Sequence, residues 1–308
     1  MKKLRISIVE YLNTAPLVWG FTDGPLAGKY DLSFTVPSQC AEALRQGQAD
    51  VAIIPSIEYQ RIEDAVALPG MAIASRREVR SLLVVAKRPI EMAKRIALDT
   101  SSRATAGMVR LLAAQQWKIR PEFVDAAPDA AKMLEHSDAA LVIGDPALRI
   151  SLKMEALAGK TPASGDCCQG DPDDMPVPGF ETLFVYDVVH QWREMTRKPA
   201  VLAIWAGRME VLTPEVVADF AASKKYGLER VHEISEAASI KLDLPPRALE
   251  RYLTENIHFD LEEDDLAGLR LYFEKAADAR LIPRSRPLEF AGAPGAVAAS
   301  RASRATYS

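Results

Sequence analysis

The chain has 308 residues, of which 48% are hydrophobic, 26% charged and 7% aromatic. This composition excludes a disordered or fibrous protein, and the length suffices for a full core and two lobes. With 38 basic and 42 acidic side chains, the formal net charge is −4. Such a balance leaves no basic face for a phosphate backbone, so we expect no nucleic-acid partner.

Residues that bind metals are few and scattered along the chain. The three cysteines lack the two-residue spacing of a zinc site, and the four histidines form no cluster. We therefore expect no metal cofactor, and the odd number of cysteines suits a reducing compartment. These residues are Cys40, Cys167, Cys168, His136, His190, His232 and His258.

The amino-terminal residues predict a cytoplasmic protein. An apolar run at residues 6–9 follows the basic Lys2 and Lys3 but stops at Glu10. A signal peptide needs roughly 7–15 apolar residues and a small-residue cleavage site, and neither is present. No other run reaches the roughly 18 apolar residues of a membrane span, so we expect no membrane partner.

The first part of the chain alternates predicted strands with a helix. Strands are expected at residues 4–9, 32–36, 50–55 and 79–86. A polar turn occupies residues 11–16, and Ser38 is the expected N-cap of a helix that closes at Gly47. This alternation predicts a parallel or mixed sheet covered by helices.

A second series of strands and helices begins near residue 95. Strands are expected at residues 95–99, 121–124 and 139–145, and helices after the cap Thr100–Ser102 and over residues 129–134. Residues 159–179 are rich in Gly, Pro and Asp and predict a surface loop. Cys167 and Cys168 lie in this loop, and the sequence assigns them no role.

The rest of the chain returns to the first lobe. A helix at 186–196 precedes an apolar run at 199–206, and helices follow at 214 onward, capped by Thr213, at 246–255 and at 262–281. We expect lobe one at 1–87 and 200–290, an inserted lobe two at 88–199, and a disordered tail at 291–308. Two such α/β lobes resemble the type II periplasmic-binding-protein architecture, with ligand in the cleft between them.

Polar residues that directly follow strands are the candidates for the cleft, because these positions face the crevice in open α/β sheets. Ser81 is a weaker candidate, since it lies inside an expected strand and its side chain could point either way. The remaining candidates are Asn13, Thr14, Ser56, Thr100, Ser101, Ser102, Arg103, Gly144 and Asp145.

Each candidate also has an ordinary structural interpretation. Residues 100–103 combine hydroxyls at a helix start with the planar charge of Arg103, which makes an anion site, but simple capping beside an exposed arginine explains them equally well. Asn13 suits a turn, and Ser56 and Asp145 suit helix caps. No nucleophile motif or glycine-rich phosphate loop is present, and Cys40 is expected to be a buried structural thiol.

Several segments, in order and with compatible spacing, resemble one known family. They are residues 8–17 (Ile-Val-Glu-Tyr-Leu-Asn-Thr-Ala-Pro-Leu), 36–38, 47–59, 78–82, 98–103 (Leu-Asp-Thr-Ser-Ser-Arg), 141–148, 186–205 and 252–273. The family is that of the chorismate dehydratases of the futalosine route of menaquinone biosynthesis, the MqnA family. The resemblance covers residues 1 to about 282, apart from the segment 159–179.

This resemblance implies a two-lobed, binding-protein-like fold and a carbon-oxygen hydro-lyase. The implied reaction eliminates water from chorismate, a small dicarboxylate, to give 3-[(1-carboxyvinyl)oxy]benzoate without a metal or organic cofactor. It also implies that Asn13 and Ser81 are catalytic, and that Thr100, Ser101, Ser102 and Asp145 line the cleft.

The base that removes the C3 proton of chorismate is left open by the sequence. Asp145, Glu58 and the enolpyruvyl carboxylate of the substrate are candidates, and a cleft lined by neutral side chains favours the last. A solute-binding protein for a small carboxylate, or a related menaquinone enzyme of the same fold, is the alternative function. The sequence predicts no oligomeric state.

Overall fold

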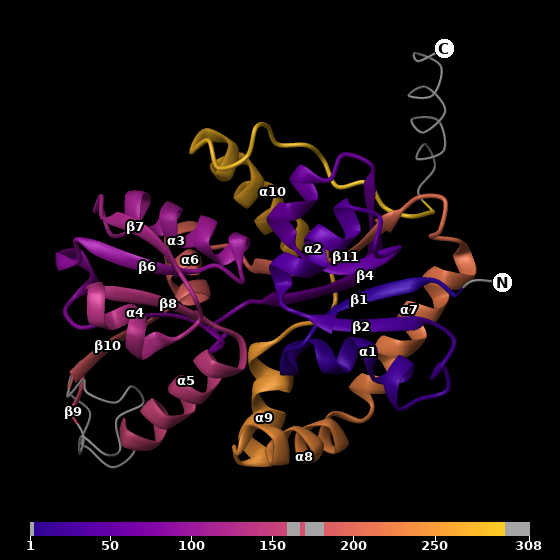
Figure 1. The fold of residues 1–308 in the computed structure, drawn as a ribbon, viewed down its shortest axis with the longest axis horizontal. Coiled ribbons are helices and arrows are strands. Elements are labelled where there is room, and N and C mark those ends of the chain that lie inside the picture. Colours follow the sequence, from indigo (N-terminus) through magenta and orange to yellow (C-terminus); the bar gives the residue numbers. More distant parts are fainter. Residues whose placement is uncertain (1–2, 159–166, 170–181, 293–308) are drawn as a thin grey trace.

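The computed structural model describes residues 3–158, 167–169 and 182–292, which form two α/β lobes side by side (Figure 1). Each lobe has a mixed sheet covered by helices, as the alternation of strands and helices predicts. The chain leaves the first sheet after Ser75, joins the second at Leu82 and returns to the first at Ala200. The expected fold of two α/β lobes is confirmed.

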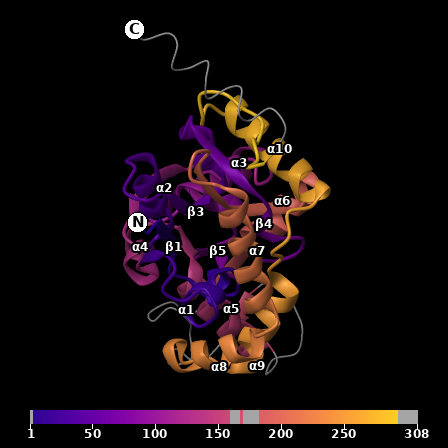
Figure 2. The same ribbon diagram turned by 90° about the vertical axis from the view of Figure 1, so that its right-hand side faces the viewer.

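The first sheet has the strand order β2-β1-β3-β11-β4, in which β1 is parallel to β2 and β3, and β11 is antiparallel to β3 and β4. Its strands are β1 (Arg5–Val9), β2 (Asp31–Thr35), β3 (Val51–Pro55), β4 (Ala65–Ser75) and β11 (Ala200–Arg208). The helices of this part are α1 (Ala15–Thr22), α2 (Pro37–Arg45), α7 (Pro214–Leu228), α8 (Val231–Leu242), α9 (Pro246–Arg251) and α10 (Glu263–Asp278), with 3₁₀ turns η1 (Leu12–Thr14) and η2 (Ser56–Arg61) and a π-helical turn η5 (Tyr252–Asn256). Helices α8 and α9 lie at the bottom of the molecule and α10 at the top in both views (Figures 1 and 2).

The second sheet has the order β7-β6-β8-β5-β10-β9, with β6 parallel to β7 and β8 and the other neighbours antiparallel. Its strands are β5 (Leu82–Ala86), β6 (Arg95–Asp99), β7 (Glu122–Ala126), β8 (Ala139–Ile143), β9 (Cys167–Gln169) and β10 (Thr182–Asp187). Its helices are α3 (Arg103–Gln115), α4 (Ala130–His136), α5 (Gly144–Ala158) and α6 (Val188–Thr196), with a 3₁₀ turn η3 (Ile90–Met92). In the described part of the chain no helix is both long and apolar enough to cross a membrane.

Two central strands are buried along their whole length. All side chains of β3 and β8 are buried, and both strands are continuous apolar runs. Such runs are typical of strands covered on both faces. The carboxyl ends of these strands therefore place the residues that follow them at the edge of each sheet, where ligands bind in α/β folds.

Two of the three expected helix caps are confirmed. The side chains of Ser102 and Thr213 each accept a hydrogen bond from a backbone N–H in the first turn of α3 and α7. The expectation for Ser38 is wrong. Helix α2 starts two residues earlier than a Ser38 cap would allow, at Pro37, with Val36 as a cap that makes no side-chain bond. Proline favours the first helical position because its φ is already fixed near the helical value.

The structure contains a long strand that the sequence analysis missed. Strand β4 has 11 residues and runs through Pro69 and Gly70, a pair typical of turns. Both residues are exposed, and the pairing with β11 shifts register between Val201 and Ala203 and again between Ile204 and Ala206. A bulged ladder thus accommodates the Pro-Gly pair inside the strand.

Three expected boundaries differ from those observed. Residues 82–86, expected in lobe one, form β5, which pairs with β8 and β10 of the second sheet. Tyr186, expected in a helix, lies in β10, because Asp187 caps α6 and starts that helix at Val188. Ala15 and Pro16, expected in a turn, begin α1.

Two further expectations lie largely outside the described residues. Of the predicted loop 159–179, residues 167–169 are described, and they form a strand paired with β10. Of the predicted tail, residues 291 and 292 are described, and the N–H of Ala291 donates to the carbonyl of Ala67 at 2.9 Å.

Cys40 is buried in α2 as expected, and burial raises the pKa of its thiol to about 11.

Helices α1 and α7 pack so closely that Gly227 has no room for a side chain. A Cβ atom there would lie 2.1 Å from the carbonyl oxygen of Pro16, which belongs to the backbone and cannot swing away. Gly107 on α3 is a useful comparison. Its nearest obstacle would be the hydroxyl of Tyr272 at 3.1 Å, the far end of a side chain.

We predict that Gly227→Ala lowers the free energy of unfolding by about 1–3 kcal/mol, the cost of overpacking a tight contact. For Gly107→Ala we expect a change below about 1 kcal/mol, because the gain in helix propensity offsets the tighter contact. Denaturant unfolding of both variants measures the difference. Equal losses in the two variants would show that the close approach of α1 and α7 is not what requires Gly227.

Candidate functional site

A cavity of about 60 Å³ lies between the two sheets, at the carboxyl ends of their parallel strands. The residues that line it follow or end β1, β2, β3, β6 and β8, or belong to β4, β5 and β11, which run past the same edge. This is where α/β folds bind ligands. The lining consists of Val9, Tyr11, Asn13, Pro37, Pro55, Ile73, Leu82, Ser102, Thr105, Ile143, Gly144, Leu202 and Ala203.

Three helices begin at the wall of this cavity. Pro37 is the first residue of α2, Ser102 caps α3, and Gly144 is the first residue of α5. The amino-terminal end of a helix carries a partial positive charge and unpaired N–H groups, which attract anions. Among the described residues that line the cavity there is no lysine or arginine. An anion would therefore be held by helix ends and neutral donors.

Tyr11 and Gly144 fit against each other at the cavity. Gly144 has φ +67, and a Cβ atom there would lie 2.6 Å from the ring of Tyr11, so only glycine fits. The Tyr11 hydroxyl shares a hydrogen bond with Ser101, whose N–H and hydroxyl both donate to the Asp99 carboxylate at 2.8 and 2.5 Å. Burial raises the pKa of Asp99. Ser101 thus connects the wall of the cavity to the end of β6.

Asn13 lines the cavity from η1, while Ser81 lies just behind the wall. Ser81 is 1% exposed and precedes Leu82, which does line the cavity. The hydroxyl of Tyr252 joins the two: it donates to Ser81 Oγ at 2.8 Å and shares a hydrogen bond with the Asn13 side chain. Burial raises the pKa of Tyr252 well above its usual value. The structure thus brings together the two residues expected to be catalytic.

The backbone just before Ser81 has an unusual shape. Arg80 has φ 64, a left-handed conformation that is rare for residues other than glycine. Its N–H donates to Asp187 Oδ2 at 2.6 Å, and its Nε donates to Ser151 Oγ at 3.1 Å. The carbonyl of Ser81 accepts from the N–H of Gly144 at 2.8 Å. These bonds fix the turn that carries Ser81.

Several other candidates from the sequence do not line this cavity. The Ser56 hydroxyl is buried and donates to the Val201 carbonyl at 2.7 Å, and Thr14 is buried within η1. Thr100 is exposed, and its hydroxyl donates to the Ala126 carbonyl. The side chain of Arg103 is 53% exposed, with Nη1 3.9 Å from Glu58 Oε2. Their side chains therefore serve structural contacts in this arrangement.

The two carboxylates considered as bases also lie outside the cavity lining. Glu58 is fully buried between the guanidinium groups of Arg45 and Arg61. Asp145 Oδ1 accepts from the N–H of Leu12 at 3.0 Å, which ties the start of α5 to η1. Burial raises the pKa of Asp145.

A larger cavity, of about 390 Å³, lies beside the first and is separated from it by Val9 and Tyr11. Its walls are mainly apolar side chains of β1, α1 and α8. The charged groups at this cavity are the acids Glu10, Asp23 and Asp145 and one base, Lys241, which pairs with Glu10 at 2.8 Å. This excess of negative charge disfavours a dianionic ligand, so size alone does not identify the site.

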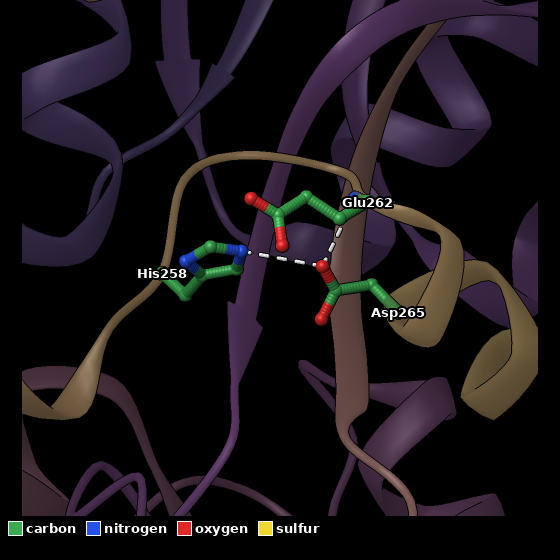
Figure 3. Close-up of side chains that lie close together, drawn as sticks. All are labelled: His258, Glu262 and Asp265. Carbon is green, nitrogen blue, oxygen red and sulfur yellow. Dashed lines mark hydrogen bonds and ion pairs between the residues drawn. The ribbon is translucent and has the colours of Figure 1, made fainter.

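His258, Glu262 and Asp265 place their ligand atoms within 4.8 Å of one another, as Figure 3 shows. The guanidinium of Arg76 bonds all three groups: Nη2 lies 2.9 Å from His258 Nε2, 2.5 Å from Glu262 Oε2 and 3.1 Å from Asp265 Oδ2. A cation of the protein itself thus occupies the centre of this cluster. Its contacts fasten the segment after β4 to the start of α10.

Sequence reasoning missed three polar residues of the site. Tyr11 lies two residues after the end of β1 and satisfies the same rule that selected Asn13. Thr105 lies in the first turn of α3, and its hydroxyl is 2.8 Å from Ser102 Oγ. Tyr252 comes from a distant helical region, where no local pattern marks it out.

The family model whose description is menaquinone biosynthesis matches residues 4–278. A chorismate dehydratase of Thermus thermophilus is 27% identical over 276 residues, which is 89% of this chain and 95% of that protein. A solved structure from Archaeoglobus fulgidus has a TM-score of 0.66 at 18% identity and covers 91% of this chain and 98% of its own. The periplasmic aliphatic sulphonate binding protein of Escherichia coli has a TM-score of 0.57 at 14% identity over 94% of each chain, which confirms the expected periplasmic-binding-protein-like fold. The chain belongs to the menaquinone biosynthesis family.

Proposed function

We propose that this protein is a chorismate dehydratase, a carbon-oxygen hydro-lyase that converts chorismate into 3-[(1-carboxyvinyl)oxy]benzoate in the futalosine route. The observation that carries the proposal is the cavity at the starts of α3 and α5. Among the described residues, its otherwise apolar lining carries the polar side chains of Tyr11, Asn13, Ser102 and Thr105 and no cationic side chain. It suits a small dicarboxylate whose own charges take part in the reaction. The similarity to a chorismate dehydratase along 89% of the chain supports the substrate.

The elimination itself asks little of the protein. Loss of the C3 proton of chorismate gives a dienolate whose charge spreads onto the ring carboxylate. Departure of the C4 hydroxyl then makes the ring aromatic, which supplies most of the driving force. The protein needs to hold two carboxylates, stabilise the spreading charge and orient the leaving hydroxyl.

Residues at the cavity can meet these needs. The first turns of α3 and α5 and the hydroxyls of Ser102 and Thr105 are the proposed partners of the carboxylates. Asn13 and Ser81 are the proposed catalytic residues, which orient the leaving hydroxyl and the reacting carbon. Asn13 lines the cavity, whereas Ser81 lies behind its wall, so the proposal requires that substrate reaches Ser81 when the lobes separate. For Arg103 we assign a role to its backbone in the first turn of α3, because its side chain pairs with Glu58.

We further propose that the enolpyruvyl carboxylate of chorismate removes its own C3 proton. Neither Asp145 nor Glu58 lines the cavity, and no histidine does so among the described residues. Both carboxylate oxygens of Glu58 are also engaged by guanidinium groups, Oε2 by Arg45 and Oε1 by Arg61. A carboxylate carried by the substrate lies within reach of the C3 hydrogen without any such partner.

Substrate access requires the lobes to separate. The cavity of about 60 Å³ is small beside the roughly 300–1,000 Å³ of typical ligand pockets. Two segments link the lobes, one between β4 and β5 and one between α6 and β11, and they are the proposed hinges. The expected cytoplasmic location and the expected lack of a cofactor remain predictions.

The proposed function predicts that the purified protein, incubated with chorismate, forms an aromatic product with loss of water. Ultraviolet absorbance and mass spectrometry of the product measure this directly. A solute-binding protein of the same fold is the alternative, and it would bind chorismate without changing it. Recovery of unchanged chorismate after incubation with correctly folded protein would therefore reject the proposal.

Asn13→Ala and Ser81→Ala are each expected to lower kcat by about 10²–10³-fold, the usual effect of removing one group that stabilises developing charge. Ser81→Ala should also lower the free energy of unfolding by about 1–3 kcal/mol, because the Tyr252 hydroxyl loses its acceptor. Ser235→Ala is the matched control, since this serine is equally buried but bonds the Val231 carbonyl within α8. Near wild-type kcat in both site variants would remove Asn13 and Ser81 from the mechanism.

Asp145→Asn is expected to keep kcat within about tenfold of wild type, because asparagine retains an oxygen that accepts the bond from Leu12, whereas loss of a general base costs about 10²–10⁴-fold. Asp145→Ala should lose more activity than Asp145→Asn, since it also removes this tie to η1. Steady-state kinetics of the two variants separate the roles. A dead Asp145→Asn variant that still folds and binds chorismate would make Asp145 the base.

A further inference from the structure

The hydroxyl of Tyr252 lies between the two residues that the proposed reaction needs. It donates to Ser81 Oγ at 2.8 Å and shares a hydrogen bond with the Asn13 side chain. Asn13 comes from η1 of the first lobe, and Ser81 comes from the segment that enters the second sheet. One phenol therefore fixes the relative position of groups from two parts of the chain.

The direction of these bonds matters for Ser81. A phenol has one hydrogen, and this hydrogen is directed at Ser81 Oγ. The hydroxyl hydrogen of Ser81 must then point to a different acceptor, since its oxygen already accepts from Tyr252. Tyr252 thus prepares Ser81 to donate a hydrogen bond, as a residue that assists a leaving hydroxyl must do.

The surroundings keep Tyr252 in its protonated form. Its side chain is 1% exposed, and burial raises the pKa of the phenol, with the nearby carboxylates of Asp145 and Asp187 acting in the same direction. A phenol that stays protonated always has a hydrogen to donate in a hydrogen bond, and it is a poor base. Tyr252 does not line the cavity, so it acts on the substrate only through its neighbours.

The backbone places this hydroxyl by a local departure from α-helical geometry. Helix α9 continues into a π-helical turn at Tyr252–Asn256, a feature that often occurs at functional sites. The other end of the turn is anchored too: Asn256 Nδ2 donates to the Glu78 carbonyl at 3.1 Å. Both ends of the π-helical turn are therefore bonded to the segment that carries Ser81.

We propose that Tyr252 is a positioning residue that aligns Ser81 and Asn13 for dehydration. This inference rests on the proposed function. The contacts predict that loss of the hydroxyl leaves the apolar packing of the ring intact but frees Ser81 to rotate. The cost should then appear in kcat rather than in KM.

A double-mutant cycle with chorismate as substrate tests this role. Tyr252→Phe is expected to lower kcat by about 10–100-fold, the size of effect that a small misplacement near the reacting atoms produces. KM should stay within about twofold of wild type. In the Ser81→Ala background the same change should cost less than about twofold in kcat, because residues that act as a unit do not add.

Tyr59→Phe is the matched control. Tyr59 is fully buried, and its hydroxyl accepts hydrogen bonds from Arg286 Nη1 and the N–H of Glu289, both at 2.9 Å, away from the cavity. This variant removes a bonded phenol of similar burial, so it should lower Tm while leaving kcat within about twofold. An equal loss of kcat in Tyr59→Phe and Tyr252→Phe would show a general effect of stability and overturn the proposal.

The outcomes separate the two levels of inference. If the wild-type protein forms no aromatic product, the proposed function fails, and the role of Tyr252 fails with it. If the wild type is active but Tyr252→Phe retains full kcat, the positioning role alone is overturned. The same holds if the fold-loss of kcat in Tyr252→Phe multiplies with the fold-loss in Ser81→Ala.

A second variant applies if Tyr252→Phe does not fold. Replacing Tyr252 by 3-fluorotyrosine keeps the hydroxyl but makes it a stronger hydrogen-bond donor. It should change kcat only where Ser81 is present, and an equal change in Ser81→Ala would reject the role.

Discussion

The half-buried carboxylate of Asp187 makes the contact on which the crossover between the lobes depends. Its Oδ2 accepts from the N–H of Arg80 at 2.6 Å, and its Oδ1 caps α6 through Val189 and His190 at 3.0 Å. The left-handed backbone of Arg80 costs about 1–3 kcal/mol in a residue other than glycine, so it persists only while such bonds hold it. Burial raises the pKa of Asp187, and the N–H donors counter that effect. Ser81 and β5 take their direction from this turn.

The distribution of positive charge explains how such a site could bind a dianion and still let it react. Arginines near the site are paired with carboxylates of the protein, as Arg45 and Arg61 are with Glu58 and Arg80 is with Glu155. The cavity itself offers helix ends and neutral donors. A guanidinium against the enolpyruvyl carboxylate would lower the proton affinity of that carboxylate and weaken it as a base. A cavity whose described lining holds no cationic side chain therefore agrees with the proposed base, which is supplied by the substrate.

The sequence predicts those features that follow from local patterns. The buried strands β3, β6 and β8 and the cap Ser102 were recognisable because apolar runs and capping residues act over a few positions. The rule that residues after strands face the cleft selected Asn13 and Gly144, and both line the cavity. It could not tell that Ser56 and Thr100 turn toward backbone carbonyls, since that depends on packing of other strands. Pro69-Gly70 in β4 is a similar case, in which the neighbouring strand overrides local turn preference.

The hydrogen bond between Tyr252 and Ser81 also joins residues far apart in the sequence. Its position affects how the two lobes can move. The residue before Tyr252, Arg251, pairs with Glu155 of α5 in the second lobe at 2.7 Å, and both side chains are exposed. Exposed ion pairs contribute at most about 1 kcal/mol to stability, so this ion pair between the lobes can break readily. The buried bond from Tyr252 to Ser81 lies at the hinge segment itself, where separation of the lobes moves atoms least. The weak ion pair between Arg251 and Glu155 would let the cleft open for substrate. The buried hydrogen bond from Tyr252 would meanwhile keep Ser81 aligned at the hinge.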